Sequence, residues 1–548
     1  MKYNLRLLLT LGLLLSTGVQ ADVGREIRNI NESLFVDRLD SRVLGRGIVH
    51  SPEFVGVFYD LLEYQPAWTD PGYVGEMISL LGESELEGLN PDDYHYGELQ
   101  ALRREYAADQ ADKDSIRAQF DVLLSDGILL LARHLLEGKI DPRTVDSSWN
   151  YPRRDFVPEV VAESLVQAIR EKRVGQALEQ LKPNVPVYRK MKEELLYYRE
   201  LADTQQFFIV PGNTVLKPKQ TQPNVVFLRR RLTQLGYLPA NAPESEYFDT
   251  KLEGAVREFQ HDHSIDSDGI VGRQSFEVLN LTFQQRVDKL RINLDRIRWI
   301  SMDLSDDFVL VNIAGYELQY FRNRELVWET PVMTGTINTR TPIFQKRLRY
   351  VEFNPTWTPP RSIINRSLFA KFKANPQYAV DKNYQFFNSS GNAVDPFAID
   401  WNKYTGLNFP YKVVQMPGPS NAMGQVKFMF PNRHAVYMHD TPSKELFSRT
   451  SRAFSAGCIR VKDPLELARI LLDDPENWSA KEIDALLASG KPQQVARMQR
   501  KIDILLMYWT VSPTTSGRMQ FHPDIYELDG PALAALDAPV AVVDAAGA

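Results

Sequence analysis

The spacing of apolar residues divides the chain into regions with different periodicities. From residue 22 to about residue 208 apolar residues recur at helical spacing, and proline-containing turns separate the runs. From residue 308 the runs become short and rich in β-branched and aromatic residues, which favours strands. We therefore predict a multidomain α+β protein that begins with a helical scaffold domain over residues 22–210.

A compact three-helix unit is predicted over residues 222–281. Its first two helices carry apolar residues at helical spacing, and a third short helix contains Phe276 and Leu279. The preceding residues 211–222 are rich in Pro, Lys, Gln and Thr and indicate a linker.

Two histidines of this unit are spaced unfavourably for a metal site. His261 and His263 lie two positions apart, not at the i,i+4 spacing that places two ligands on one helix face. We interpret both as surface residues.

Residues 296–530 are predicted to form a mainly β catalytic domain. Strands are expected over residues 308–313, 316–320, 349–353, 426–430, 435–439 and 502–511. The stretch between Pro359 and Pro417 is poor in strand signals and too long for a structureless loop. We therefore predict an inserted lid subdomain over residues 361–415. The last residues, 531–548, are Ala-, Val-, Asp- and Pro-rich and are predicted to be a disordered tail.

The first residues have the pattern of an export signal. Lys2 and Arg6 precede an apolar run over residues 7–15, and small residues at 19–21 suit cleavage after Ala21, so residues 1–21 are expected to be a signal peptide. The apolar run is shorter than the roughly 20 residues that span a bilayer, and no transmembrane helix is expected in the mature chain.

The overall composition excludes some classes of protein. At 548 residues with 43% hydrophobic and 24% charged residues, the chain fits several soluble globular domains. The net charge of −6 argues against a nucleic-acid-binding protein, because phosphate recognition needs concentrated Lys and Arg.

The sequence contains one cysteine, Cys458. No internal disulfide can form, and a single thiol in an exported protein is either a partner for another molecule or a reactive group. The small residues Ser455, Ala456 and Gly457 lead into Cys458, and Arg460 follows it. Such a turn exposes sulfur and backbone N–H groups, and the charge of Arg460 favours the thiolate. These surroundings indicate a nucleophile rather than an inert thiol.

A nucleophilic thiol needs a base, and histidine is the usual one. Of the eight histidines, only His434, His439 and His522 lie in the β-rich region that contains the cysteine. Strand alternation places Tyr437 and His439 on one face, and His439 directly precedes an Asp-Thr-Pro sequence. We predict that His439 is the base. No cluster of His and carboxylate residues has metal-ligand spacing, so no metal and no other cofactor is predicted.

Three segments resemble the catalytic core of the L,D-transpeptidases: residues 421–428, 437–442 and 455–461. Cys458 follows His439 by nineteen positions, in the order typical of that family. Residues 222–281 resemble the peptidoglycan-binding domain of many wall enzymes. The resemblance covers nearly the whole chain and implies the large periplasmic type of Gram-negative bacteria. Family members commonly have histidine before the glycine-cysteine pair, where this chain has Ala456.

The resemblance implies a two-step acyl transfer between peptidoglycan stem peptides. The Cys458 thiolate attacks the amide between the L-centre of meso-diaminopimelate and the terminal D-Ala of a donor tetrapeptide, and D-Ala leaves. A side-chain amine of an acceptor diaminopimelate then takes the acyl group from the thioester, which makes a 3-3 cross-link. Carbapenems are expected to acylate the same thiol.

The resemblance also suggests a role for each residue near the cysteine. His439 acts as base and then as acid, and the N–H groups of Gly457 and Cys458 are the expected oxyanion donors. Tyr437, Arg460 and Ser455 are assigned to oxyanion or substrate binding. Arg460 either contacts a substrate carboxylate or braces the turn.

Two other functions stay open from the residues alone. Water can replace the amine at the thioester, which would make the protein an L,D-carboxypeptidase or endopeptidase of wall peptides. A catalytically inactive wall-binding scaffold protein is the other possibility, and the intact pair of His439 and Cys458 argues against it.

Overall fold

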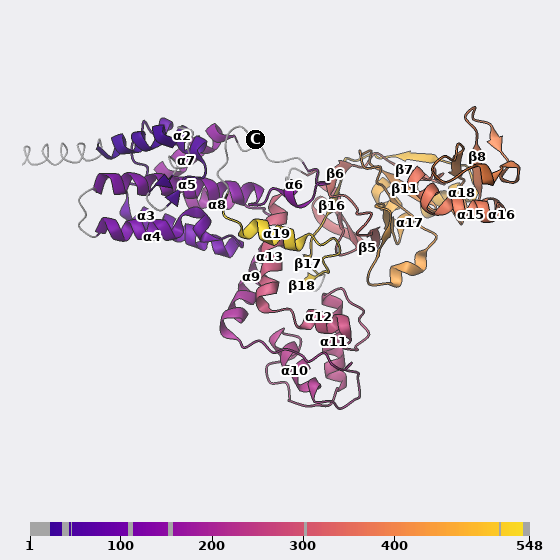
Figure 1. The fold of residues 1–548 in the computed structure, drawn as a ribbon, viewed down its shortest axis with the longest axis horizontal. Coiled ribbons are helices and arrows are strands. Elements are labelled where there is room, and N and C mark those ends of the chain that lie inside the picture. Colours follow the sequence, from indigo (N-terminus) through magenta and orange to yellow (C-terminus); the bar gives the residue numbers. More distant parts are fainter. Residues whose placement is uncertain are drawn as a thin grey trace, which may run out of the picture.

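In the computed structural model, a helical region and a sheet-rich domain lie at opposite ends of an elongated body, and a small helical domain projects from between them (Figure 1). The predicted multidomain α+β class is confirmed. The expected signal peptide lies outside the described residues. The structure describes residues 22–34, 43–44, 47–107, 113–151, 157–300, 304–514 and 517–540. Among these residues, no helix combines the length and apolar content needed to cross a bilayer.

The helical region is built around one central helix, α5 (Lys113–Glu137). From residue 121 to residue 132, the side chains on all sides of this helix are buried. Helices that are apolar all round occupy the centre of a domain. Its polar residue Asp121 is satisfied by the hydroxyl of Tyr59 at 2.8 Å and the amide of Ala67 at 2.9 Å. The surrounding helices are residues 22–34, α2 (Pro52–Leu61), α3 (Pro71–Gly82), α4 (Tyr96–Ala107), α6 (Pro142–Val145), α7 (Pro158–Arg170), α8 (Val174–Leu181) and α9 (Pro186–Thr204).

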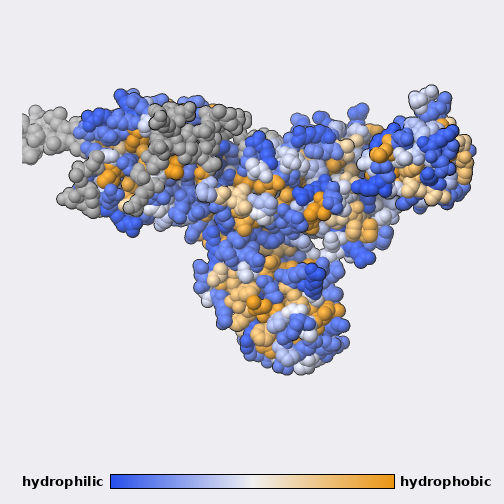
Figure 2. Space-filling model, viewed as in Figure 1, coloured by the Kyte–Doolittle hydropathy of each residue, from blue (hydrophilic) through white to orange (hydrophobic). Residues whose placement is uncertain are grey.

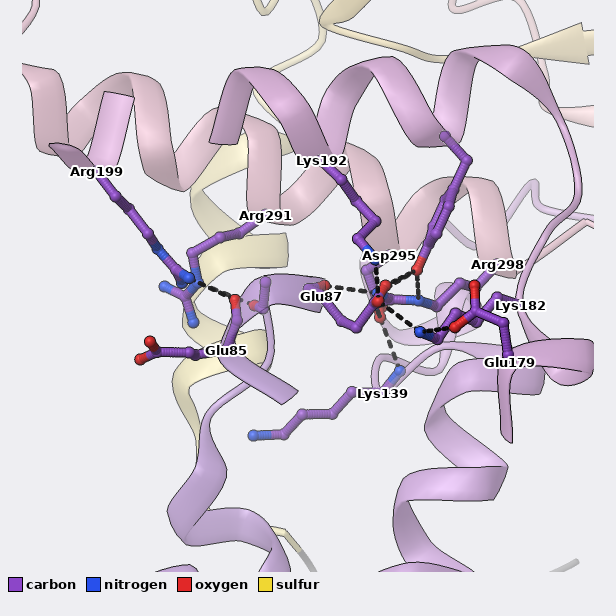
Figure 3. Close-up of polar contacts among 12 residues, drawn as sticks. Glu85, Glu87, Lys139, Glu179, Lys182, Lys192, Arg199, Arg291, Asp295 and Arg298 are labelled. Atoms are coloured by element: carbon purple, nitrogen blue, oxygen red, sulfur yellow. Dashed lines mark hydrogen bonds and ion pairs between the residues drawn. The ribbon is translucent and has the colours of Figure 1, made fainter. Parts of the chain in front are cut away.

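A buried charge cluster fixes this region to α13 (Phe283–Arg298), the helix that leads into the catalytic domain (Figure 3). Glu87 accepts hydrogen bonds from the Tyr188 hydroxyl at 2.6 Å and forms an ion pair with Lys182 at 2.8 Å. Arg298 donates to the backbone carbonyl of Glu87 at 2.6 Å and pairs with Asp295 at 3.3 Å. We call Glu87, Lys182, Tyr188, Asp295 and Arg298 the Glu87 cluster.

The small domain contains the three predicted helices, α10 (Asn224–Gln234), α11 (Thr250–Asp262) and α12 (Arg273–Leu279). The interpretation of residues 211–222 as a linker is wrong. Leu216 exchanges two backbone hydrogen bonds with Val271, and Lys219 donates to the carbonyl of Phe248. These bonds pair the segment with the domain, because its backbone groups find partners there that composition alone does not show.

The prediction that His263 lies on the surface is also wrong, whereas His261 is exposed. His263 is buried where the small domain meets α13. It hydrogen-bonds the carbonyl of Phe259 at 2.8 Å and Arg286 at 2.8 Å, and its ring stacks on Phe521. Phe521 belongs to the hairpin of β17 (Val511–Pro513) and β18 (Met519–Phe521), so this histidine links the small domain to the catalytic domain.

The catalytic domain is organised by an eleven-stranded sheet with the order β15-β7-β11-β12-β14-β5-β4-β3-β16-β6, and β13 pairs with β5. The long strand β5 and the short β6, β13, β14 and β15 were not predicted. The strands are β3 (Asp307–Asn312), β4 (Glu317–Arg322), β5 (Glu325–Gly335), β6 (Phe344–Arg347), β7 (Tyr350–Phe353), β11 (Val426–Met429), β12 (Met438–His439), β13 (Ala453–Ser455), β14 (Ile459–Val461), β15 (Gln494–Arg497) and β16 (Ile502–Met507).

The two faces of this sheet differ in chemistry. Cross-strand register aligns Val351, Phe428, Met438 and Ile459 on one face, and all four are buried. The opposite face of the same strands carries ionisable and polar side chains, because successive residues point to opposite sides. We call it the catalytic face.

The insertion has a core of its own. Phe372, Phe386, Trp401 and Phe409 pack in a cluster separate from the main core. It lies beyond β7 and β11, at the far end of the body from the helical region (Figure 1). Contrary to the weak strand signals, it contains a three-stranded sheet. Its elements are α14 (Arg361–Ile363), α15 (Phe369–Ala374), α16 (Gln377–Asp381), β8 (Tyr384–Phe387), β9 (Ala393–Val394) and β10 (Lys412–Gln415).

The C-terminal tail was predicted to be disordered over 531–548, and this is wrong for its first part. Helix α19 (Asp529–Asp537) packs along α13. Asp529 forms an ion pair with Arg296 at 2.6 Å, and Asp537 forms one with Arg291 at 2.7 Å. Alanine-rich composition suits a helix once a neighbouring helix covers one side. Residues 541–548 lie outside the described residues.

Candidate active site

The predicted site residues meet on the catalytic face. Strands β12 and β14 run parallel, with Met438 opposite Ile459 and His439 opposite Arg460. His439 therefore lies beside Arg460, and Tyr437 lies beside Cys458 two positions earlier on the same face. Lys427 of β11 lies opposite His439 on its other side. Its ammonium stands 4.0 Å from the centre of the Tyr437 ring.

The turn before Cys458 is held from both sides. Gly457 has φ of +112°, a conformation that favours glycine. Its N–H donates to the hydroxyl of Ser455 at 3.0 Å, and its carbonyl accepts from the hydroxyl of Thr341 at 2.9 Å. The Gly457 amide, predicted as an oxyanion donor, is thus engaged with Ser455. The backbone N–H of Cys458 has no hydrogen-bond partner among the described residues.

A second layer of hydrogen bonds braces Thr341 itself. Its hydroxyl accepts from the amide of Gly335 at 2.9 Å, and its own amide donates to the hydroxyl of Tyr526 at 2.9 Å. Tyr526, which is fully buried, donates in turn to the carbonyl of Gly335 at 2.9 Å. The segment before α19 therefore supports the turn that carries the cysteine. We call Gly335, Thr341 and Tyr526 the turn brace.

The orientation of the His439 ring follows from its neighbour in the chain. Nδ1 contacts the backbone carbonyl of Asp440, which can only accept, so Nδ1 carries the proton and Nε2 is the basic nitrogen. The Asp440 carboxylate is fixed by the amide of Gln425 at 2.9 Å and by Lys444. Gly424 lies against it so closely that a β-carbon there would collide with that carboxylate.

Burial sets the protonation states of the two central residues. It raises the pKa of the Cys458 thiol, although hydrogen bonding from Tyr437 and the charges of Lys427 and Arg460 act in the opposite direction. Burial and the charge of Arg460 lower the pKa of His439 to about 3. The charge of Arg460 favours the thiolate, as predicted, but desolvation outweighs it and the net pKa of the thiol is raised.

Cys458 and His439 are both neutral at ordinary pH in this structure. No hydrogen bond joins their side chains among the described residues. Such contacts are often long in enzymes without substrate and shorten when it binds. This arrangement suits proton transfer from thiol to imidazole during attack rather than a preformed ion pair.

Two cations stand on the catalytic face without ion-pair partners in the described part of the chain. The Nε atom of Arg460 is buried and makes no hydrogen bond. Lys427 lies opposite Glu352 across β7 and β11, and burial lowers the pKa of its ammonium. Buried cationic donors without partners are suited to bind a carboxylate or a developing oxyanion.

Sequence reasoning missed Lys427 and the turn brace. A lysine between Val426 and Phe428 in a predicted strand marks the polar face by alternation, and this signal was available. Thr341 and Tyr526 carry no local signal, because they are far from Cys458 in sequence. Within the described ranges, no group of three or more His, Cys, Asp or Glu side chains is arranged to hold a metal ion.

Three protein-family models match separate parts of the chain. Residues 306–480 match the model of the L,D-transpeptidase catalytic domain. Residues 53–195 match a scaffold domain, and residues 221–279 match a model described as "Putative peptidoglycan binding domain".

A curated relative from Haemophilus influenzae, named "Putative L,D-transpeptidase", is 38% identical over 244 residues, which cover 44% of this chain and 48% of the relative. The chain thus matches about half the length of that relative.

Two solved structures are among the matches. An L,D-transpeptidase from Xylanimonas cellulosilytica is 15% identical, with 54% of this chain and 98% of that chain covered and a TM-score of 0.18. The Ldtfm-avibactam carbamoyl enzyme is 12% identical, with 37% and 49% covered and a TM-score of 0.18. On these matches, residues 306–480 form an L,D-transpeptidase catalytic domain, and a scaffold domain and a peptidoglycan-binding-type domain precede it.

Proposed function

We propose that the protein is a cysteine-dependent L,D-transpeptidase that forms 3-3 cross-links in peptidoglycan outside the cytoplasm. The Cys458 sulfur attacks the carbonyl carbon of the L-centre of diaminopimelate in a donor tetrapeptide. The amide bond to D-Ala breaks, and D-Ala leaves with a proton. The amine of an acceptor diaminopimelate then attacks the thioester, which forms the new amide and returns the thiol.

The position of His439 is the observation that carries this proposal. Its Nδ1 is committed to the Asp440 carbonyl, so Nε2 is the nitrogen available to take the thiol proton. The same nitrogen returns that proton to the departing D-Ala amine and later deprotonates the acceptor amine. Its low pKa keeps the imidazole unprotonated across the whole physiological range.

Oxyanion stabilisation is assigned to the Cys458 amide and the cations of the catalytic face. The Cys458 N–H has no hydrogen-bond partner in the described part of the chain, whereas the Gly457 N–H would have to leave Ser455 to take part. Lys427 and Arg460 supply positive charge close to the sulfur, as their effect on its pKa indicates. Tyr437 remains a predicted contributor through its position beside Cys458.

The insertion over residues 361–415 is proposed to close over the donor stem and exclude water from the thioester. Its separate aromatic core supports this role, because it allows the subdomain to move as a unit. If the role is correct, deleting the insertion raises the ratio of hydrolysed to cross-linked product. An unchanged ratio in a folded deletion variant contradicts it.

Mass spectrometry of muropeptides tests the reaction directly. Purified protein is incubated with disaccharide-tetrapeptides, and the products are sequenced by fragmentation. The proposal expects dimers joined between two diaminopimelate residues and one free D-Ala for each dimer, with Cys458→Ala inactive. Tripeptides without dimers would instead make the protein a carboxypeptidase, and equal dimer formation by Cys458→Ala would exclude the cysteine mechanism.

A further inference from the structure

Hydrophilic residues cover much of the visible surface of the molecule (Figure 2). An exposed charge on such a surface needs no ligand to explain it, whereas buried charged groups are normally paired. Arg460 of β14 departs from this rule. Its Nε atom is buried without a hydrogen-bond partner, and its guanidinium forms no ion pair in the described part of the chain. Burial lowers the pKa of this guanidinium, which is the direction expected for a cation that no carboxylate compensates.

A second arginine nearby shows what a structural role looks like. Arg452, which precedes β13, donates to the backbone carbonyls of Val332 at 3.1 Å and Tyr316 at 3.0 Å. These bonds hold the segment before the catalytic turn in place. Arg460 makes no such bond to the backbone among the described residues, so bracing of the turn, one of its two predicted roles, is not what its side chain does there.

The side chain of Arg460 lies beside both reactive residues. Parallel pairing of β12 with β14 places His439 opposite Arg460, and Cys458 lies two residues earlier on the same face, roughly 7 Å away at about 3.3 Å per residue. Burial and the charge of Arg460 lower the pKa of His439, and the same charge opposes the rise that burial causes in the pKa of the thiol. On the other side, the neighbour of Arg460 in β5 is Met333, which offers no anionic partner.

The proposed reaction brings a carboxylate to this position. Nε2 of His439 gives a proton to the nitrogen that leaves, so that nitrogen lies next to His439. It belongs to D-Ala, whose carboxylate carbon is about 2.5 Å from it across two covalent bonds. Lys427, the other cation beside His439, is turned to the ring of Tyr437 at 4.0 Å. Arg460 is therefore the cation whose N–H groups are available to a carboxylate at this place.

The acceptor nitrogen carries the same chemical group. The two amino-acid centres of meso-diaminopimelate have opposite configurations, and the L-centre lies in the main chain of the stem. The side-chain amine and its carboxylate are therefore on the D-centre, with the configuration of D-Ala. The leaving nitrogen and the attacking nitrogen bond to the same carbonyl carbon, so each occupies the position beside His439 in turn.

We propose that Arg460 binds the α-carboxylate of whichever D-amino-acid group occupies that position, D-Ala in the first step and the D-centre of the acceptor in the second. One subsite then serves both half-reactions, and it selects acceptors with a carboxylate on the carbon that bears the amine. D-Ala has to leave before the acceptor enters, so free D-Ala competes with the acceptor. This assignment rests on the proposed function, which supplies both nitrogens.

Binding to the full chain with Cys458→Ala tests the contact without turnover. Calorimetry compares a stem tetrapeptide that ends in D-Ala with the same peptide ending in D-alaninamide. The acid is expected to bind roughly tenfold to a hundredfold more tightly, as for a hydrogen bond to a charged group. Adding Arg460→Gln removes this preference. Lys462→Gln keeps it, because that exposed lysine lies beyond the end of β14.

The ratio of the two affinities is the decisive quantity, because general damage to the site weakens the acid and the amide alike. An unchanged ratio in Arg460→Gln with an unchanged melting temperature overturns the contact. Equal binding of acid and amide by the Cys458→Ala protein itself, which needs no further variant, overturns it as well.

Kinetics with intact Cys458 test whether one subsite serves both steps. Release of D-Ala is compared with release of D-alaninamide, and cross-linking is compared between acceptors with a free and an amidated side-chain carboxylate. Arg460→Gln is expected to remove both preferences, and free D-Ala is expected to inhibit competitively against the acceptor. Loss of only one preference overturns the shared subsite. If the enzyme releases no D-Ala at all, the proposed function fails, while the binding ratio still decides the contact.

Discussion

The Glu87 cluster and the catalytic face both bury several charged groups, but only the first pairs them with one another. In the Glu87 cluster each charged side chain meets an opposite charge or a hydroxyl (Figure 3). On the catalytic face, as far as the described residues show, the buried Nε of Arg460 has no hydrogen-bond partner, and neither Cys458 nor His439 forms an ion pair.

This difference separates structural charges from reactive ones. Leaving a buried polar group unpaired costs about 1–3 kcal/mol, and a bound substrate that supplies the missing partner recovers this free energy. The Glu87 cluster uses its charges to fix the scaffold to α13. The catalytic face leaves its donors available for a substrate that brings the missing acceptors.

The largest expected effect is on the catalytic face. His439→Gln removes the base and is expected to lower D-Ala release about 10²–10⁴-fold, because general base catalysis contributes a factor of that size. His434→Gln is the matched control, since that half-buried histidine lies on the same segment but outside the site. Similar rates for both variants would show that His439 has no catalytic role.

The Glu87 cluster is expected to respond in stability and not in chemistry. Glu87→Gln leaves Arg298 and Lys182 without a full counter-charge, and breaking a buried pair of this kind costs about 3–5 kcal/mol. Chemical denaturation measures the loss, and kcat of the folded fraction stays unchanged. Glu85→Gln, an exposed neighbour, is the control. A large fall in kcat with normal stability would remove the distinction between the two regions.

The loss of stability at acid pH gives a second test of the ion pairs of Glu87. Burial alone would raise the pKa of Glu87, but the charges of Arg298 and Lys182 outweigh it and lower that pKa to about 2. A carboxyl with a lowered pKa stabilises the fold above its unfolded value of about 4.3 and loses this contribution as pH falls toward 2. Glu87→Gln should therefore flatten the loss of stability between these pH values. An identical slope in parent and variant contradicts the pairing.

A smaller effect is expected from the turn brace. Tyr526→Phe removes the acceptor for the Thr341 amide and the donor to Gly335, which costs about 1 kcal/mol for each bond lost. The Gly457 turn then holds Cys458 less firmly, so kcat falls several-fold while KM is kept. If Thr341→Val and Tyr526→Phe act through one network, their effects on kcat are not additive. Additive effects, or a change in KM alone, would count against the brace.

The smallest expected effect is that of pH on kcat/KM for D-Ala release. His439 stays neutral down to about pH 3, and burial keeps Cys458 protonated above the usual thiol range. The reactive neutral pair then persists between these limits, so kcat/KM for D-Ala release should change little from pH 5 to 8. A decline below pH 7 with an apparent pKa near 6.5 would mean that His439 is not desolvated.

Sequence reasoning found the parts of the site that lie close together in the chain. Cys458 and His439 stood out through the single thiol, the small-residue turn and the spacing between them. Strand alternation marked Lys427 as a polar position, but the pairing of distant segments that brings Lys427 and Thr341 to Cys458 is not revealed by one sequence. Tyr526 was not assigned because no local pattern links it to Cys458, and the helix that follows it was read as disordered. His263 was misplaced for a similar reason, because its burial depends on a hairpin more than two hundred residues later.

Acylation by a carbapenem tests most directly whether Cys458 is the nucleophile activated by His439. The β-lactam acts as an acyl donor, and its ring-opened product stays on the sulfur as a thioester. Intact-mass and peptide mapping should show one adduct per chain, located on the peptide that contains Cys458, and its formation should be at least tenfold slower in His439→Gln. An adduct on another residue, or equally fast acylation without His439, would contradict the account.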